Sequence, residues 1–303
     1  MRATGTGDIP EATAPRFHAA AGTLYVVATP LGNLRDVTLR ALDVLATADV
    51  IAAEDTRVTT PLLRHFGVAT RPLSLHEHNE AKRAATIVGL LREGRSVALV
   101  TDAGTPAISD PGARLVAAVR AASLPVVPIP GPNAAVAAVS AAGLAAERFV
   151  FAGFLPAAAK ARRELLATLA PLPLAVVVYE APHRVVRTAG ELAAALGGDR
   201  AVVVAREITK KFETIASMPL ADAAAWLAAD GHRTRGEFVL VVDAPREASA
   251  RDVAPAPPLA VERLLRALAE ELPPARAARV AAAATGLDRD TLYARIRALK
   301  PGG

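Results

Sequence analysis

Residues 24–33 read LYVVATPLGN and set the fold class. The first six are apolar, aromatic or β-branched, as is typical of a buried strand, and Pro30 and Gly32 then turn the chain into a loop. Asp36 can cap a helix in which leucines recur at helical spacing from position 39. A buried strand that runs into an amphipathic helix is the unit from which parallel sheets are built.

The same alternation of strand and helix continues to residue 129. Further strands are predicted at Val50–Ala53, Pro72–Leu75, Ser96–Thr101 and Val126–Ile129. Strands separated by helices favour a mostly parallel sheet, so we predict an N-terminal α/β domain over residues 23–144. In such sheets ligands bind at the carboxyl ends of the strands.

The second half of the chain contains more strands than helices. Strands are predicted at Phe149–Phe154, Leu174–Tyr179, Ala201–Ile208, Glu213–Ala216 and Phe238–Val242. This ratio predicts a mixed sheet in a second α/β domain over residues 145–244.

Three further segments lie outside these domains. Residues 1–22 are predicted to form a disordered leader. Residues 245–258 contain Pro, Ala and charge without periodicity, which is typical of a linker. Beyond them a helical extension over residues 259–303 is predicted, with helices at Leu259–Glu271, Pro274–Thr285 and Arg289–Leu299.

The composition excludes several classes of site. The chain has 303 residues and no cysteine, so disulfides, thiolate nucleophiles and iron–sulfur clusters are excluded. None of the six histidines forms the helical pair of a metalloprotease, and we predict no metal site. No signal peptide is recognisable, and the longest apolar stretch, residues 134–146, is too short to span a bilayer. We therefore expect a cytoplasmic protein without a membrane partner.

The formal charge of +5 admits nucleic acid as a partner without requiring it. A composition rich in Arg and Ala also follows from the base composition of a genome, so both explanations stay open at this point. Aromatic residues make up only 4% of the chain, which argues against base stacking as the main means of recognition.

Loops rich in glycine and proline follow three predicted strands, at residues 30–33, 101–106 and 130–135. Because the carboxyl ends of parallel strands meet at one edge of the sheet, these loops are expected to form a cleft lined by backbone groups. None of them has the glycine pattern of a dinucleotide site or a P-loop. Each loop alone is an ordinary turn, and only their combination indicates a ligand site.

Polar side chains follow four strands, at residues 54–57, 76–79, 179–184 and 206–211. A carboxylate or an imidazole in a cleft can accept a proton. Each of these side chains also suits a helix cap or an ion pair. Four such clusters at strand ends are hard to explain by capping alone.

In order along the chain, the motifs PLGN (30–33), EDTR (54–57), DAGTP (102–106), SDPG (109–112) and PGP (130–132) resemble the ribosomal RNA small-subunit methyltransferase I family, a branch of the tetrapyrrole methylase superfamily. The resemblance continues through GFLP (153–156), YE (179–180), HR (183–184), REITK (206–210), ET (213–214) and GE (236–237). It covers residues 23–243, and the helical tail resembles the C-terminal helix-turn-helix-like extension of that family.

The resemblance implies transfer of a methyl group from S-adenosylmethionine to the ribose 2′-oxygen of a cytidine in the decoding centre of 16S rRNA. It implies two α/β domains with the cofactor in the cleft between them, a homodimer, and the small ribosomal subunit as partner. On this basis the cofactor is expected to contact Pro30, Leu31, Gly32, Asp102, Ala103, Gly104, Thr105, Ile108, Gly131, Pro132, Ala134, Ala135, Tyr179 and Gly236.

The protein mainly has to position the ribose hydroxyl and accept its proton, because the cofactor is already activated. The candidates for this role are Glu54, Asp55, His76 and Glu207, and the cluster from Glu54 to Arg57 is favoured because it lies beside the first loop. RNA contacts are expected from Arg57, Lys160, Arg162, Arg163, Arg184, Lys210, Lys211, Arg233 and Arg235, each of which also reads as a solvated surface charge.

Two alternatives remain. One is a sister enzyme of the superfamily that methylates a small molecule or a protein, against which the motifs EDTR and YExxHR and the tail argue. The other is a non-catalytic factor that binds the ribosome or DNA through the basic tail. Such a factor would bind S-adenosylmethionine weakly or not at all.

Overall fold

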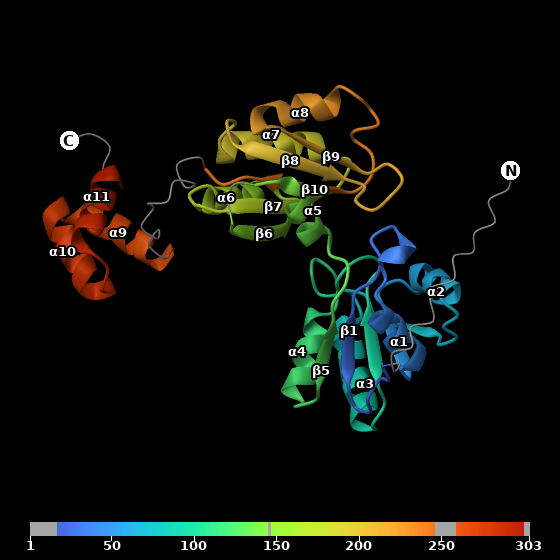
Figure 1. Cartoon of the computed structure of the whole chain (residues 1–303). Helices are drawn as coiled ribbons and strands as arrows, with labels where there is room; N and C mark the ends of the chain where they lie inside the picture. The colour runs from blue at the N-terminus through green and yellow to red at the C-terminus, as the bar shows by residue number, and fades with distance from the viewer. Residues whose placement is uncertain (1–16, 145–146, 246–258, 300–303) are drawn as a thin grey trace.

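The computed structural model describes residues 17–144, 147–245 and 259–299, and its strands form two separate five-stranded sheets (Figure 1). In the first sheet the strand order is β3-β2-β4-β1-β5, and every neighbouring pair is parallel. Its strands are β1 (Leu24–Val27), β2 (Val50–Ala53), β3 (Pro72–Ser74), β4 (Val97–Val100) and β5 (Val126–Ile129). The predicted α/β class and the parallel sheet are confirmed.

Helices cover both faces of the first sheet because its strands are apolar on both sides. The helices are α1 (Leu39–Thr47) and α2 (Thr56–His65) on one face, and α3 (Glu80–Arg92) and α4 (Ala113–Ala121) on the other. Successive residues of a strand point to opposite faces, so Ile51 joins the first core and Ala52 the second. The sheet is therefore the middle of three layers.

The second sheet is mixed, as predicted. Its order is β6-β7-β10-β8-β9, where β6 and β7 are parallel and the other neighbouring pairs are antiparallel. The strands are β6 (Phe149–Phe154), β7 (Ala175–Glu180), β8 (Ala201–Arg206), β9 (Thr214–Pro219) and β10 (Phe238–Val242). One face is covered by α6 (Ala159–Leu169), α7 (Val185–Leu196) and α8 (Leu220–Ala228).

The opposite face of the second sheet is covered by α5 (Ala134–Ala142), which the sequence assigned to the first domain. Ala135 and Ala138 are buried against Val177 and Val241 of this sheet. Small side chains allow the helix to approach the sheet closely, and no local signal in the sequence says which sheet such a helix joins. On packing grounds we propose a boundary between β5 and α5.

Two local predictions are wrong for identifiable reasons. Asp36 ends a single 3-10 turn, η1 (Leu34–Asp36), and the hydroxyl of Thr38 caps α1 instead. Strand β8 ends at Arg206 rather than continuing to position 208, because Glu207 has a left-handed backbone with φ of +52°.

Residues 17–22, which the sequence placed in a disordered leader, pack on the first domain. The backbone N–H of Phe17 donates to Asp43, and its ring meets Tyr25 edge-on at 5.8 Å between centroids. Ala19 donates to the hydroxyl of Thr47 at 3.0 Å. The rest of that predicted leader lies outside the described residues.

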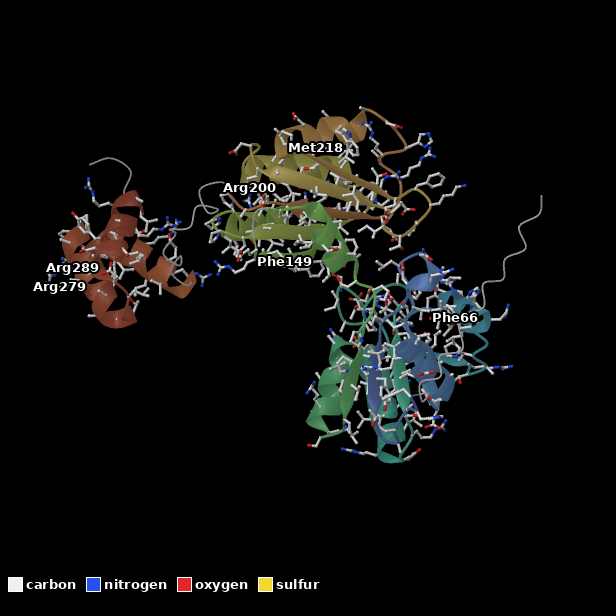
Figure 2. The ribbon with its side chains drawn as sticks, viewed as in Figure 1. Phe66, Phe149, Arg200, Met218, Arg279 and Arg289 are labelled. Carbon is white, nitrogen blue, oxygen red and sulfur yellow. The ribbon has the colours of Figure 1, made fainter. Side chains whose placement is uncertain are left out.

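Arg200 is buried in the second domain and hydrogen-bonds three of its segments (Figure 2). Its guanidinium donates to the carbonyls of Asp243, Leu174 and Leu196, which lie where β10 and α7 end and before β7 begins. A guanidinium has five donors and satisfies several such carbonyls at once. Arg200 thus joins three segments of one end of the sheet.

The C-terminal helices form a small unit with a core of its own. They are α9 (Leu259–Glu271), α10 (Pro274–Thr285) and α11 (Arg289–Leu299). Leu265, Ala277 and Ile296 are buried among them, and Arg295 bonds both carboxylate oxygens of Glu262. The predicted linker, residues 245–258, lies outside the described residues except for position 245. Across the described part of the chain, every helix is too short or too polar to cross a membrane.

Helix α4 is capped from a distance by Glu80, the first residue of α3. One oxygen of its buried carboxylate accepts the backbone N–H groups of Gly112, Arg114 and Leu115 at 2.9–3.0 Å. These groups are the unpaired donors at the start of α4, and Gly112 has no side chain with which to cap them. The contact also fixes the loop between β4 and α4.

We expect Glu80→Ala to lower the free energy of unfolding by about 2–4 kcal/mol, because it leaves three buried donors without an acceptor. Glu80→Gln keeps an acceptor oxygen and serves as the control, with a loss of about 1 kcal/mol. Denaturant unfolding followed by circular dichroism measures both. Equal losses in the two variants would contradict a capping role.

Candidate active site

A pocket of about 420 Å³ lies between the two sheets; we call it the interdomain pocket. The loops of the first domain and the start of α5 contribute the lining residues Leu31, Glu54, Asp102, Ala103, Gly104, Thr105, Ile108, Ser109, Asp110, Asn133 and Ala134. From the second domain it is lined by Phe154, Tyr179, Glu180, Ala181, Pro182, Ile208, Glu237, Phe238 and Val239. It sits at the carboxyl ends of the parallel strands, where ligands bind in open α/β sheets.

Reciprocal backbone hydrogen bonds join the predicted loops into one wall of this pocket. Thr29 and Gly104 exchange N–H and carbonyl groups at 2.9 and 3.0 Å, and the hydroxyl of Thr105 donates to the carbonyl of Pro132 at 3.0 Å. Gly104 has φ of +85°, and a Cβ there would lie 3.3 Å from Leu31. A side chain at Gly104 would therefore strain the turn and crowd the wall.

Eight of the residues predicted to contact the cofactor line the pocket: Leu31, Asp102, Ala103, Gly104, Thr105, Ile108, Ala134 and Tyr179. The other six are not among its lining residues: Pro30, Gly32, Gly131, Pro132, Ala135 and Gly236. Glycine is needed at two of these because a Cβ on Gly131 would meet Ala28 at 2.9 Å and one on Gly236 would meet Glu207 at 2.5 Å.

Tyr179 links β7 to the start of α5. Its hydroxyl accepts the N–H of Ala135 at 3.0 Å, and its ring lies edge-on to Phe151 and Phe154. Burial raises the pKa of the Tyr179 phenol, which stays protonated and keeps its own hydrogen free to donate. The aromatic group thus offers the pocket both an apolar face and a donor.

Three carboxyl groups gather at the floor of the pocket, where the loops after β2 and β4 interlock. The N–H of Asp102 donates to Glu54 at 3.3 Å, while Asp102 accepts the N–H of Asp55 at 3.0 Å. The hydroxyl of Thr101 donates to Asp110 at 3.1 Å. Burial raises the pKa of each of Glu54, Asp102 and Asp110.

Asp110 is the most perturbed of these groups. Burial, followed by the negative charge of Glu54, raises its pKa to about 6. The motif SDPG contains Asp110 but did not by itself assign it a role; the signal in the sequence is its position beside Pro111 and Gly112, in the loop after β4. Phe154 and Glu180 were also missed as lining residues.

A second cavity, of about 480 Å³, adjoins the first; we call it the polar pocket. It is lined by Glu54, Asp55, Thr56, Arg57, Ser74, His76 and Asp102. Glu54 and Asp102 line both cavities, so they form a shared wall. His76, which follows β3, and the cluster after β2 are thereby brought together as the sequence suggested.

The carboxylate of Asp55 is already hydrogen-bonded within its own loop and helix. It caps α2 by accepting the N–H of Arg57 at 2.8 Å, and it pairs with the guanidinium of the same residue. These hydrogen bonds lower the pKa of Asp55 to about 2. A carboxylate that binds a proton so weakly is a poor base at neutral pH.

Glu207 lines neither cavity. Its carboxylate accepts from the ammonium of Lys210 and the N–H of Glu237, both at 3.0 Å. Burial acts to raise the pKa of Glu207, and these hydrogen bonds outweigh it and lower the pKa. The stem of Lys210 packs so closely on Gly32 that a Cβ there would clash, so this group ties the second domain to the first loop.

The cations predicted to contact RNA divide into two groups. Arg162 is buried, with only 3% of its side chain exposed, and pairs with Glu191, so it cannot reach RNA; its place on the inner face of α6 was not visible from charge alone. Arg184 pairs with Glu180, Lys210 pairs with Glu207 and Glu237, and Arg233 lies over the ring of Trp226. The exposed ones are Arg57, Lys160, Arg163, Lys211 and Arg235.

Comparison with known families gives two matches. Residues 23–224 match the model of the tetrapyrrole (corrin/porphyrin) methylases, and residues 255–300 match that of the C-terminal helix-turn-helix domain of small-subunit rRNA methyltransferase I. The second match covers the helices α9, α10 and α11.

Individual relatives agree with these models. Ribosomal RNA small subunit methyltransferase I of Vibrio cholerae is 48% identical over 270 residues, which are 89% of this chain and 92% of that protein. The protein of the same name from Pseudomonas aeruginosa is 45% identical over 274 residues, which are 90% of this chain and 96% of that protein.

Solved structures share the fold. A cobalt-precorrin-4 methyltransferase of cobalamin biosynthesis has a TM-score of 0.56 at 21% identity and covers 75% of this chain and 96% of its own. A uroporphyrin-III C-methyltransferase from Thermus thermophilus, in complex with S-adenosylhomocysteine, has a TM-score of 0.52 at 19% identity and covers 73% of this chain and 97% of its own. With parallel and mixed sheets arranged as described and both family models matched, the chain belongs to the tetrapyrrole methylases and, within them, to the ribosomal RNA small subunit methyltransferase I family.

Proposed function

We propose that this protein transfers a methyl group from S-adenosylmethionine to the ribose 2′-oxygen of a cytidine in 16S rRNA. The observation that carries the proposal is the pairing of two cavities across Glu54, together with membership of a family whose members are named rRNA methyltransferases. The cytidine, its place in the decoding centre and a homodimer rest on the resemblance of the motifs, and a cytoplasmic location rests on the lack of a recognisable signal peptide.

The residues of the interdomain pocket fit S-adenosylmethionine. Leu31, Ile108 and Phe154 offer apolar surface for an adenine ring, and the Gly104 loop offers backbone groups for the polar end. Glu54, Asp102 and Asp110 supply negative charge, which complements a sulfonium and an amino group. When bound, the cofactor supplies a methyl group already activated for displacement.

Glu54 is the residue we propose to accept the proton of the ribose hydroxyl. It faces both cavities, and burial raises its pKa, which makes its carboxylate a stronger base than an exposed one. Its Oε2 accepts the N–H of Asp102 at 3.3 Å, and the carboxylate has no cationic partner among the described residues. His76, on the polar pocket, is the second candidate.

RNA binding is proposed to use the exposed cations Arg57, Lys160, Arg163, Lys211 and Arg235. Such side chains bind phosphates without reading sequence, which suits recognition of a folded ribosomal particle by shape. The helical unit α9–α11 adds Arg279 and Arg289, labelled in Figure 2, and both are exposed. We propose the small ribosomal subunit as the partner.

The activity is tested by incubating the protein with methyl-labelled S-adenosylmethionine and small ribosomal subunits from a strain that lacks the gene. The RNA is then digested, and the modified nucleoside is identified by mass spectrometry. The expected product is 2′-O-methylcytidine from one site. Bound cofactor without transfer to the subunit would favour a sister enzyme with another substrate, and absence of cofactor binding would favour a non-catalytic factor.

We expect Glu54→Gln to lower kcat by about 100-fold or more, because a glutamine cannot accept the proton. The dissociation constant of S-adenosylmethionine should change by only about threefold, since one of several polar contacts is altered. The control is Glu77→Gln, an exposed carboxylate that lines neither cavity. Wild-type turnover in the Glu54 variant would move the role to His76.

The raised pKa of Asp110 predicts an unusual pH dependence of stability. Asp110 keeps its proton up to about pH 6 when folded, whereas an unfolded Asp releases it near pH ~3.9. Folding therefore takes up a proton between these values, and ionised Asp110 opposes folding above pH 6. We expect Asp110→Asn to raise the thermal midpoint at pH 8 and to have little effect near pH 4. A stability gain that is equal at both values would contradict this.

A further inference from the structure

The interdomain and polar pockets differ in the chemistry of their walls. Within the described part of the chain, the interdomain pocket is lined by no Lys, Arg or His. Three carboxyl groups without a cationic partner, those of Glu54, Asp102 and Asp110, lie on its floor. The polar pocket also has three carboxyl groups, from Glu54, Asp55 and Asp102, but it adds a guanidinium, an imidazole and two hydroxyls, from Arg57, His76, Thr56 and Ser74. The first pocket suits a cationic ligand, and the second offers acceptors for hydroxyl groups beside one guanidinium for a phosphate.

Part of the Arg57 guanidinium is not used by its partner Asp55. Asp55 engages Nε and Nη2, and 89% of the Arg57 side chain is exposed, so the remaining N–H groups face solvent. Arg57 also stands in the first turn of α2, where the helix dipole favours an anion. A phosphate at this place would receive hydrogen bonds from a guanidinium that is already oriented by its carboxylate partner.

One ring nitrogen of His76 makes no hydrogen bond among the described residues. Its backbone N–H bonds the side chain of Asn79 at 2.9 Å, which fixes the turn after β3. Its Nδ1 is shielded from solvent and has no hydrogen-bond partner within the described ranges. The residue also lines the polar pocket, so its imidazole borders the space that a hydroxyl or phosphate oxygen would fill.

The shared wall gives the two cavities one reaction centre. An in-line displacement places the attacking oxygen and the leaving sulfur on opposite sides of the transferred carbon. Glu54 and Asp102 line both cavities, so an oxygen in the polar pocket and a sulfonium in the interdomain pocket would border the same two residues. A cavity of about 480 Å³ holds a ribose with a phosphate but no RNA helix.

We propose that the polar pocket receives the ribose and the adjoining phosphate of the target nucleotide, turned out of the RNA stack, with the phosphate on Arg57 and a sugar or phosphate oxygen on His76. This assignment rests on the proposed function, because it names the part of that site that admits RNA. It makes entry of a single extruded nucleotide, rather than binding of a duplex, the condition for transfer.

Filling the pocket tests the assignment. Ser74→Phe places a ring in the cavity at a residue that does not itself line the interdomain pocket. We expect methyl transfer to small ribosomal subunits to fall by about 100-fold while the calorimetric dissociation constant of S-adenosylmethionine stays within about twofold of wild type. The matched control is Ala69→Phe, at an exposed residue of a neighbouring cavity of the same domain that shares only Thr56 with the polar pocket.

Arg57→Ala provides a second test that does not depend on a core substitution, since the side chain is exposed. We expect the KM for the subunit to rise about tenfold and the KM for S-adenosylmethionine to stay unchanged, because a charged contact to phosphate is lost. A thermal midpoint near that of wild type in both variants excludes misfolding as the cause.

The outcomes separate the two proposals. Wild-type protein that transfers no methyl to the subunit would overturn the proposed function and this assignment with it. Transfer by wild type that Ser74→Phe and Arg57→Ala both retain would overturn the assignment alone. Loss of S-adenosylmethionine binding in a folded Ser74→Phe variant would also overturn it, since the cavity would then belong to the cofactor.

Discussion

The site depends on one backbone interaction, the reciprocal pair of hydrogen bonds between Thr29 and Gly104. It is an antiparallel bridge beyond the ends of the parallel strands β1 and β4, and it joins the loops that follow them. Thr105 then reaches Pro132, so the loop after β5 is held as well. These loops are joined through main-chain groups, and the φ of +85° at position 104 is one that glycine adopts without strain.

The same wall separates two kinds of chemistry. Carboxyl groups that burial has made more basic lie at the junction of the loops after β2 and β4, and each accepts hydrogen bonds from the backbone or hydroxyls of these loops rather than from a cation. Charges left without a cationic partner are costly in a fold, and functional sites are where proteins retain them. The arrangement gives Glu54 access to both cavities at once.

Across the cleft, the second domain contributes shape more than charge. Tyr179 and Phe154 provide an aromatic wall, while Glu180 and Glu237 are neutralised by Arg184 and Lys210. The group formed by Glu207, Lys210 and Glu237 presses on Gly32 and so couples the position of the second domain to the first loop. Charged residues that looked like RNA contacts therefore hold the cleft together.

Local sequence patterns were enough to predict the succession of strands and helices along the chain, the parallel first sheet, the mixed second sheet and the loops that line the cleft. These follow from local patterns: apolar runs, glycine and proline at strand ends, and polar residues directly after them. Four features became visible only in the folded chain: α5 packs on the second sheet, Arg162 is buried, Asp55 is bonded to Arg57, and Asp110 lines the interdomain pocket. Each of these depends on a partner distant in sequence or on the side of an element that faces inward, and a local pattern carries no information about either.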